Sequence, residues 1–274
     1  MKAIFTVSAL CILLANAAVA QQAAQTTTDR ITVPFSDPER PGTLRVKLLG
    51  GTVTIKGSSR RDVLFVANSQ EARQVLRRRQ QEPPPGMRRL TQPGGFGIEE
   101  RDNEMSVSSG INRDGINLDI EIPMRTKLRV STIDGGVSVD SVDSEIEINT
   151  VDGAITLTNV GGSVVAHAVD GHINATVARV APQAPMAFTS LNGDIDVTLP
   201  AAVKANLRLR SDQGDVFTDF DVQVTASASA NRTQRNGRGV RIDLNRSIYG
   251  TVNGGGPDFE LRTFDGNIYV RKGK

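Results

Sequence analysis

The sequence predicts an all-β chain that folds as a β-solenoid with about 18–22 residues in each coil. Two observations lead to this fold class. A motif of the form Thr-x-Asp-Gly, with close variants, begins at Thr132, Thr150 and Ala168, a constant step of 18 residues, and again at Ser190 after 22 residues. The segments on both sides of each motif alternate between apolar and polar residues, as half-buried strands do.

Each motif is expected to turn the chain, because Asp-Gly and Asn-Gly tolerate positive φ at low cost. A shift of 18 residues places Ile146 on Val164 and Ile148 on Ala166, so inward positions stack on inward positions. A solenoid coil must close in register with the next coil and therefore needs a constant step. The alternative is an antiparallel β-sandwich with each Asp-Gly at a hairpin tip, which has no such need.

Stacked coils would align the turn residues in a structural ladder along one edge. Neighbouring side chains in that ladder would lie one strand spacing apart, about 4.8 Å. Three interpretations follow: carboxylates that hydrogen-bond the turn backbone, a Ca²⁺ site, or the paired acids of a sugar-cleaving enzyme. The first is favoured, since the Ca²⁺-binding Gly-Gly-x-Gly-x-Asp repeat is absent and there is no Trp and only two Tyr to hold a sugar. The ladder comprises Asp134, Gly135, Asp152, Gly153, Asp170, Gly171, Asn192, Gly193, Asp265 and Gly266.

The chain divides into an export signal, a short lead-in and one domain. Residues 1–20 combine Lys2, an apolar run and the small-x-small site Ala18-Val19-Ala20, which predicts a signal peptide and a periplasmic or extracellular location. Residues 21–30 are predicted to be a disordered lead-in. Residues 31–274 form a single solenoid, with the N-terminal strands and the Gly250–Lys274 segment expected to cap its ends.

An Arg/Pro-rich insertion at 68–97 breaks the alternation. Helix formers precede three prolines, which predicts a short exposed helix followed by a stiff loop. Residues 60–90 hold eight arginines against three acidic residues, so this region is either a solvated face or a site for an anionic partner. The candidate anion-binding residues are Arg73, Arg77, Arg78, Arg79, Arg88 and Arg89.

Composition argues against several function classes. The single cysteine, Cys11, lies in the predicted signal peptide, which excludes a disulfide framework and thiolate chemistry in the exported chain. Without Lys2, 31 basic residues face 30 acidic ones, so no global charge favours nucleic acid. His167 and His172 show no metal-ligand spacing, and no nucleophile elbow or phosphate loop is present. We therefore expect no enzyme activity, no cofactor, and no transmembrane segment after the signal peptide.

Four stretches resemble the bacterial "putative adhesin" domain family, a domain-of-unknown-function family of envelope proteins with β-solenoid folds. They occur in order with the Thr-x-Asp-Gly repeats and together cover about residues 35–270 outside the insertion. The resemblance implies a non-catalytic surface or periplasmic role and supplies no catalytic residues. The matching stretches are Pro41–Val46, Gly51–Gly57, Gly250–Pro257 and Leu261–Ile268.

The main functional hypothesis is an adhesin-like interaction or scaffold module that contacts a protein or glycan of the cell envelope through many weak, regularly spaced contacts. One alternative is a polysaccharide lyase or hydrolase that uses Asp134, Asp152 and Asp170. Another is a binder of anionic envelope polymers through the arginines of the insertion. Uncovered solenoid ends would favour self-association.

Overall fold

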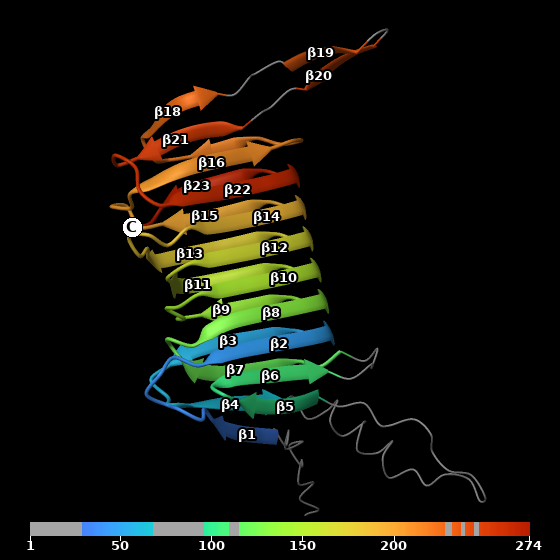
Figure 1. Ribbon diagram of the computed structural model, residues 1–274, viewed down its shortest axis with the longest axis vertical. Coiled ribbons are helices and arrows are strands. Elements are labelled where there is room, and N and C mark those ends of the chain that lie inside the picture. Colours follow the sequence, from blue (N-terminus) through green and yellow to red (C-terminus); the bar gives the residue numbers. More distant parts are fainter. Residues whose placement is uncertain (1–28, 68–95, 110–114, 228–231, 237–238, 244–246) are drawn as a thin grey trace, which may run out of the picture.

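The computed structural model describes residues 29–67, 96–109, 115–227, 232–236, 239–243 and 247–274, which form a stack of coils between two long sheets (Figure 1). Sheet A has ten strands and sheet B has eleven. In spatial order, sheet A contains β1 (Asp29–Pro34), β4 (Asp62–Ala67), β7 (Leu118–Pro123), β3 (Val53–Ser58), β9 (Val137–Asp140), β11 (Ile155–Gly161), β13 (Ile173–Arg179), β15 (Ile195–Leu199), β23 (Ile268–Lys272) and β17 (Val216–Thr218).

Sheet B faces sheet A across the core, and a separate two-stranded sheet joins β19 (Arg232–Asn236) to β20 (Gly239–Asp243). In spatial order, sheet B contains β18 (Val222–Ser227), β21 (Ile248–Val252), β16 (Ala205–Ser211), β22 (Asp258–Asp265), β14 (Met186–Asn192), β12 (Val164–Asp170), β10 (Ile146–Asp152), β8 (Lys127–Asp134), β2 (Thr43–Gly50), β6 (Glu104–Ser109) and β5 (Phe96–Arg101).

The predicted β-solenoid is confirmed. Each coil consists of one strand of sheet B, a first corner, one strand of sheet A and a second corner that leads back to sheet B. Strands of successive coils pair in parallel, with Ile146 opposite Val164 and Ile148 opposite Ala166, as the 18-residue step predicts. The antiparallel sandwich is wrong, because a hairpin at each Asp-Gly would pair β8 with β9, whereas β8 pairs with β10 and β9 with β11.

The coils do not stack in sequence order. The β2–β3 coil lies between β6–β7 and β8–β9, and the β22–β23 coil lies between β14–β15 and β16–β17. The C-terminus accordingly lies beside the stack and not at its end (Figure 1). The expectation that Gly250–Lys274 caps the solenoid is therefore wrong for β22 and β23. They form an inner coil because their apolar faces are buried against neighbours on both sides.

Antiparallel strands close both ends of the stack. At one end β1 pairs with β4, β4 with β7, and β5 with β6; at the other, β16 pairs with β21 and β21 with β18. Two predicted boundaries change as a result. Asp29 and Arg30 belong to β1 because they pair with Ala67 and Val66, and β5 already begins at Phe96, inside the predicted insertion.

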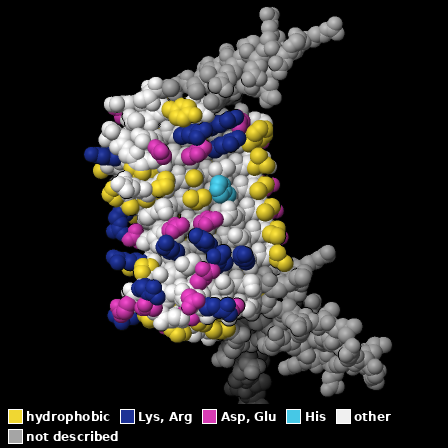
Figure 2. All heavy atoms as spheres, in the orientation of Figure 1, with side chains coloured by type: hydrophobic (Ala, Val, Ile, Leu, Met, Phe, Trp, Pro, Cys, Tyr) yellow, Lys and Arg dark blue, Asp and Glu magenta, His cyan; other side chains and the backbone are white. Residues whose placement is uncertain are grey.

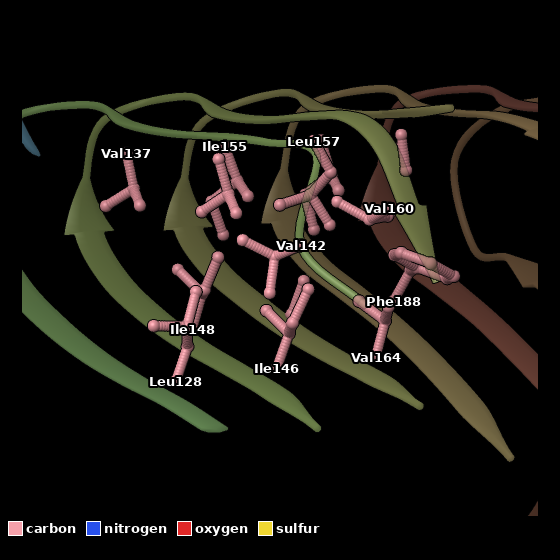
Figure 3. Close-up of a cluster of buried hydrophobic side chains, with 14 of the residues drawn as sticks. Leu128, Val137, Val142, Ile146, Ile148, Ile155, Leu157, Val160, Val164 and Phe188 are labelled. Atoms are coloured by element: carbon pink, nitrogen blue, oxygen red, sulfur yellow. The ribbon is translucent and has the colours of Figure 1, made fainter. Parts of the chain in front are cut away.

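The core is a set of parallel files of apolar side chains, one from each coil. Leu128, Ile146 and Val164 from sheet B face Val137 and Ile155 from sheet A across the interior (Figure 3). Each of these side chains is almost fully buried, which contributes about 1.5–3 kcal/mol per residue. This continuous core holds both corners in fixed positions.

Candidate interaction edge

The predicted turn ladder runs along the first corner, where strands of sheet B end and the chain passes into sheet A. The register places Asp134 opposite Asp152, Asp152 opposite Asp170, and Asn192 opposite both Asp170 and Asp265. The backbone N–H of each following glycine donates to the carbonyl oxygen of the next ladder residue, at 2.8–2.9 Å. The ladder is therefore a continuous main-chain structure.

Glycine is required at this corner for two reasons. Gly153 has φ of +151°, a conformation that L side chains rarely adopt. A Cβ atom at that position would lie only 2.5 Å from the carbonyl oxygen of Gly135 in the neighbouring coil. The close approach of successive glycines lets the corners stack at the strand spacing.

Buried hydroxyls, and not the ladder carboxylates, support the turn. In the described part of the chain, none of the four ladder aspartates makes a hydrogen bond or ion pair through its carboxylate, so the predicted bonds to the turn backbone are absent. Instead, Thr263 Oγ1 donates to Gly193 O at 2.9 Å, and Ser190 Oγ donates to Gly171 O at 2.9 Å. The first residue of the motif is therefore the one that fixes the corner.

The two histidines lie on different sheets. His167 is exposed on the outer face of β12, and His172 begins the sheet A side of its coil, where its Nδ1 accepts a hydrogen bond from the Asp194 N–H at 2.9 Å. Within the described ranges, no three His, Cys, Asp or Glu side chains gather in a way that could hold a metal ion. His172 thus connects two coils at the corner.

An apolar ridge, which the sequence analysis missed, runs beside the ladder. It consists of the residue that immediately precedes each ladder Asp or Asn, together with Leu49, whose following residue Gly50 lies opposite Asp134. Its side chains are 41% to 51% exposed. The strand register makes these residues lateral neighbours in successive coils. A column of hydrophobic side chains marks this edge on the right of Figure 2. The apolar ridge comprises Leu49, Ile133, Val151, Val169, Leu191 and Phe264.

The ridge reverses the normal alternation of its strands. In β8 the inward position is the buried Thr132 and the outward position is the exposed Ile133; in β22 they are Thr263 and Phe264. A strand face that meets only water normally has polar residues outside and apolar residues inside. This position shows the opposite arrangement in successive coils. The signal was present in the sequence as the apolar x of every Thr-x-Asp-Gly copy.

The surroundings of the ridge define what it can contact. The ladder carboxylates flank it on the sheet A side, and an outward polar row on sheet B, including Asn149, His167 and Thr189, flanks it on the other. Six positions at about 4.8 Å per coil give a length of about 24 Å. Contiguous exposed apolar surface of this kind is typical of protein–protein contact sites. The ridge ends at Asp212, which is paired with Arg210 at 2.8 Å.

The predicted anion-binding arginines, Arg73, Arg77, Arg78, Arg79, Arg88 and Arg89, lie outside the residues that the structure describes, as does the helix expected before Pro83. They remain a prediction. Among the described residues, no helix has the length and apolarity that a membrane span requires.

Comparison with known proteins gives one family model and two solved structures with weak similarity. A family model described as Toastrack DUF4097 matches residues 105–271, more than half of the chain. No curated protein matches. A "putative cell adhesion protein" from Clostridium sporogenes ATCC 15579 is 11% identical with a TM-score of 0.48, covering 90% of this chain and 100% of that one. A "putative adhesin" from Bacteroides fragilis NCTC 9343 is 10% identical with a TM-score of 0.36, covering 89% and 96%.

Proposed function

This chain belongs to the Toastrack DUF4097 family, and on that premise we propose that it is a non-catalytic, adhesin-like interaction module of the cell envelope. Its sequence-predicted signal peptide supports export to the periplasm or the cell exterior. The partner is an envelope component that the chain contacts through its first corner.

The observation that carries this proposal is the apolar ridge. Val151, Val169 and Leu191 are each close to half exposed although they lie on strands whose remaining outward positions are mostly polar. Burying such side chains against a partner contributes about 25 cal/mol per Å² of apolar area. Because one apolar side chain comes from each coil, many modest contacts add along a single line.

The flanking ladder indicates the chemistry of the partner. Asp134, Asp152, Asp170 and Asp265 place four carboxylates along one side of the ridge. A protein surface that carries an apolar strip edged by lysine or arginine would match both features. Exposed charge pairs of this kind steer association and weaken as salt is added.

Two features support a non-catalytic role. The ladder carboxylates lie on an exposed corner one strand spacing apart, where bulk water surrounds them. An enzyme that cleaves sugars instead relies on an enclosed acid whose environment separates its pKa from that of its partner. The ladder follows from the coil geometry, because the carbonyl oxygen of each ladder residue accepts a hydrogen bond from the turn glycine N–H of the preceding coil in the stack.

The test is co-sedimentation of the purified protein with envelope fractions of the source organism, at low and high salt. The triple variant Val151→Thr, Val169→Thr and Leu191→Thr makes three ridge positions polar and places β-branched side chains, which suit strands, at all three. We expect it to lose at least tenfold in apparent affinity, with little change in melting temperature.

The matched control changes Thr156, Thr176 and Thr198 to Ser on the outer face of sheet A in the same three coils. We expect the control to bind as the parent does. Equal binding by the ridge variant and the parent would refute the proposal. Release of sugars into the supernatant, abolished by Asp152→Asn, would instead establish the sugar-cleaving alternative.

A further inference from the structure

A hollow of about 860 Å³ lies at the second corner, on the other side of the solenoid from the ridge. Segments far apart in the sequence form it. They are the β1–β2 loop, the β3–β4 turn, the β7–β8 turn and the ends of three further coils. The non-sequential stacking brings them together, because it places the β2–β3 coil directly between β6–β7 and β8–β9. A hollow of this volume is within the range of small-molecule sites.

Four guanidinium groups from four of these segments line the hollow: Arg40, Arg61, Arg125 and Arg179. Arg40 is paired with Asp37 at 2.6 Å, and Arg179 is paired with Asp143. Arg61 lies 3.7 Å from Glu39, but both side chains are more than four-fifths exposed, so this pair is weak.

Arg125 is the unpaired cation of the hollow. It lies in the β7–β8 turn, is exposed, and has no ion pair or hydrogen bond through its side chain among the described residues. With Arg61 only weakly held, two guanidinium groups are available to an incoming anion. Guanidinium groups bind carboxylate and phosphate through paired hydrogen bonds.

Thr126, the neighbour of Arg125, lies at the floor of the hollow. It is 1% exposed, and its Oγ1 is the one buried side-chain N or O atom without a hydrogen-bond partner among the described residues. Buried hydroxyls in proteins almost always have a partner. This hydroxyl is enclosed beneath the lining, so the Thr126 side chain supports the hollow from below and does not face its contents.

Part of the remaining wall is apolar, and hydrogen bonds hold both of its sides in place. Phe35 and Met124 line it together with prolines. The Ser36 backbone N–H donates to Glu100 Oε1 at 3.0 Å and its Oγ donates to Glu100 Oε2 at 2.7 Å, which fixes the loop that carries Phe35. On the opposite side, Asn159 Nδ2 donates to Ser141 Oγ at 3.1 Å and links two coils. The hollow is thus largely formed before any ligand arrives, which lowers the cost of binding.

We propose that this hollow binds a small soluble organic anion, a phosphate or carboxylate joined to an apolar body. Arg125 and Arg61 bind the anionic group, and the wall around Phe35 and Met124 holds the apolar part. The site is independent of the ridge, so either can fail without the other.

The test is titration calorimetry of the purified protein with phenyl phosphate, inorganic phosphate and phenol at 150 mM salt. We expect phenyl phosphate to bind with Kd below about 1 mM, inorganic phosphate at least fivefold more weakly, and phenol not to bind measurably. Arg125→Gln should weaken phenyl phosphate binding at least tenfold without lowering the melting temperature.

The matched control is Arg262→Gln, which removes an exposed arginine from the outer face of β22, outside the hollow. It should bind phenyl phosphate as the parent does. Equal losses in Arg125→Gln and Arg262→Gln would show nonspecific charge attraction and overturn the proposal. A second outcome would also overturn the proposal: the protein binds phosphatidylcholine vesicles that contain phosphatidic acid but does not bind phenyl phosphate. That result would indicate a membrane surface as the target.

Discussion

The two corners of the solenoid are built under different constraints. At the first corner, the same number of residues, two, separates the strands of β2–β3, β8–β9, β10–β11, β12–β13, β14–β15 and β22–β23, as in Gly135–Gly136. At the second corner the connections vary, with residues 141–145, 162–163 and 180–185 between successive strands. Close glycine stacking permits only one corner geometry, whereas the second corner tolerates loops of different length. At the first corner, apolar side chains at equivalent positions therefore line up as a ridge. At the second corner, side chains of different kinds surround a hollow.

The largest effect should come from breaking the glycine stack. Gly153→Ala forces an L side chain into φ of +151° and a Cβ atom to 2.5 Å from a carbonyl oxygen, so we expect a loss of about 3–5 kcal/mol in unfolding free energy. Chemical denaturation measures it.

Gly254→Ala is the matched control, since Gly254 has φ of +87° but no atom within 4 Å of the added Cβ. This substitution should lower the unfolding free energy by about 1–2 kcal/mol, because it strains the backbone conformation without a steric clash. Equal losses in the two variants would mean that corner stacking contributes nothing beyond backbone conformation.

A smaller effect, with different outcomes at the two corners, should follow from replacing threonine by the isosteric valine. Thr263→Val removes the Oγ1 that donates to Gly193 O and should cost about 1 kcal/mol. Thr126→Val removes a hydroxyl that has no partner among the described residues and should leave stability unchanged or raise it by up to about 1 kcal/mol. Thermal melts of both variants check this; a loss at Thr126 equal to that at Thr263 would contradict the contrast.

The smallest effect is a local response to pH at the second corner. Hydrogen bonds from Ser36 hold the pKa of Glu100 below its ordinary value of 4.5. A carboxyl with a lowered folded pKa stabilises the folded state above its unfolded pKa, and that contribution is lost as the pH falls through the folded value. We therefore expect the Ser36 amide to lose hydrogen-exchange protection below about pH 4.5.

The Gly153 amide is the internal reference, because it donates to the main-chain oxygen of Asp170 at 2.9 Å and involves no carboxylate. Its protection factor should stay constant over the range in which that of Ser36 falls. In Glu100→Gln the pH dependence at Ser36 should disappear, and its persistence would rule out Glu100 as the titrating group.

The sequence was sufficient for the repeating part of the fold. A step of 18 residues places Ile146 on Val164, and the structure shows that pairing. The inner position of the β2–β3 and β22–β23 coils could not be predicted, because no local signal states which coil lies beside which. The ridge could have been found, since Ile133, Val151 and Val169 occupy the same place in each motif copy.

The hollow could not have been predicted from the sequence. Arg40, Arg61, Arg125 and Arg179 meet only because the coils stack out of sequence order, and nothing near any of them in the chain marks it as a neighbour of the others. The sequence drew attention to the arginine-rich insertion because its charges are adjacent in the chain. Local density of charge and spatial convergence of charge are different signals, and only the first can be read from one sequence.

The position of β22–β23 also bears on the order in which the molecule can be assembled. An ordinary solenoid grows one coil at a time, and each new coil adds to a finished surface. Here β14–β15 and β16–β17 must leave a gap of one coil between them until Asp258–Lys272 has been synthesised. The β22–β23 coil fills that gap, so the two blocks become one cooperative unit only after translation has passed this segment. Until then the gap stays open, and in the folded chain β23 is held by β15 on one side and by β17 on the other.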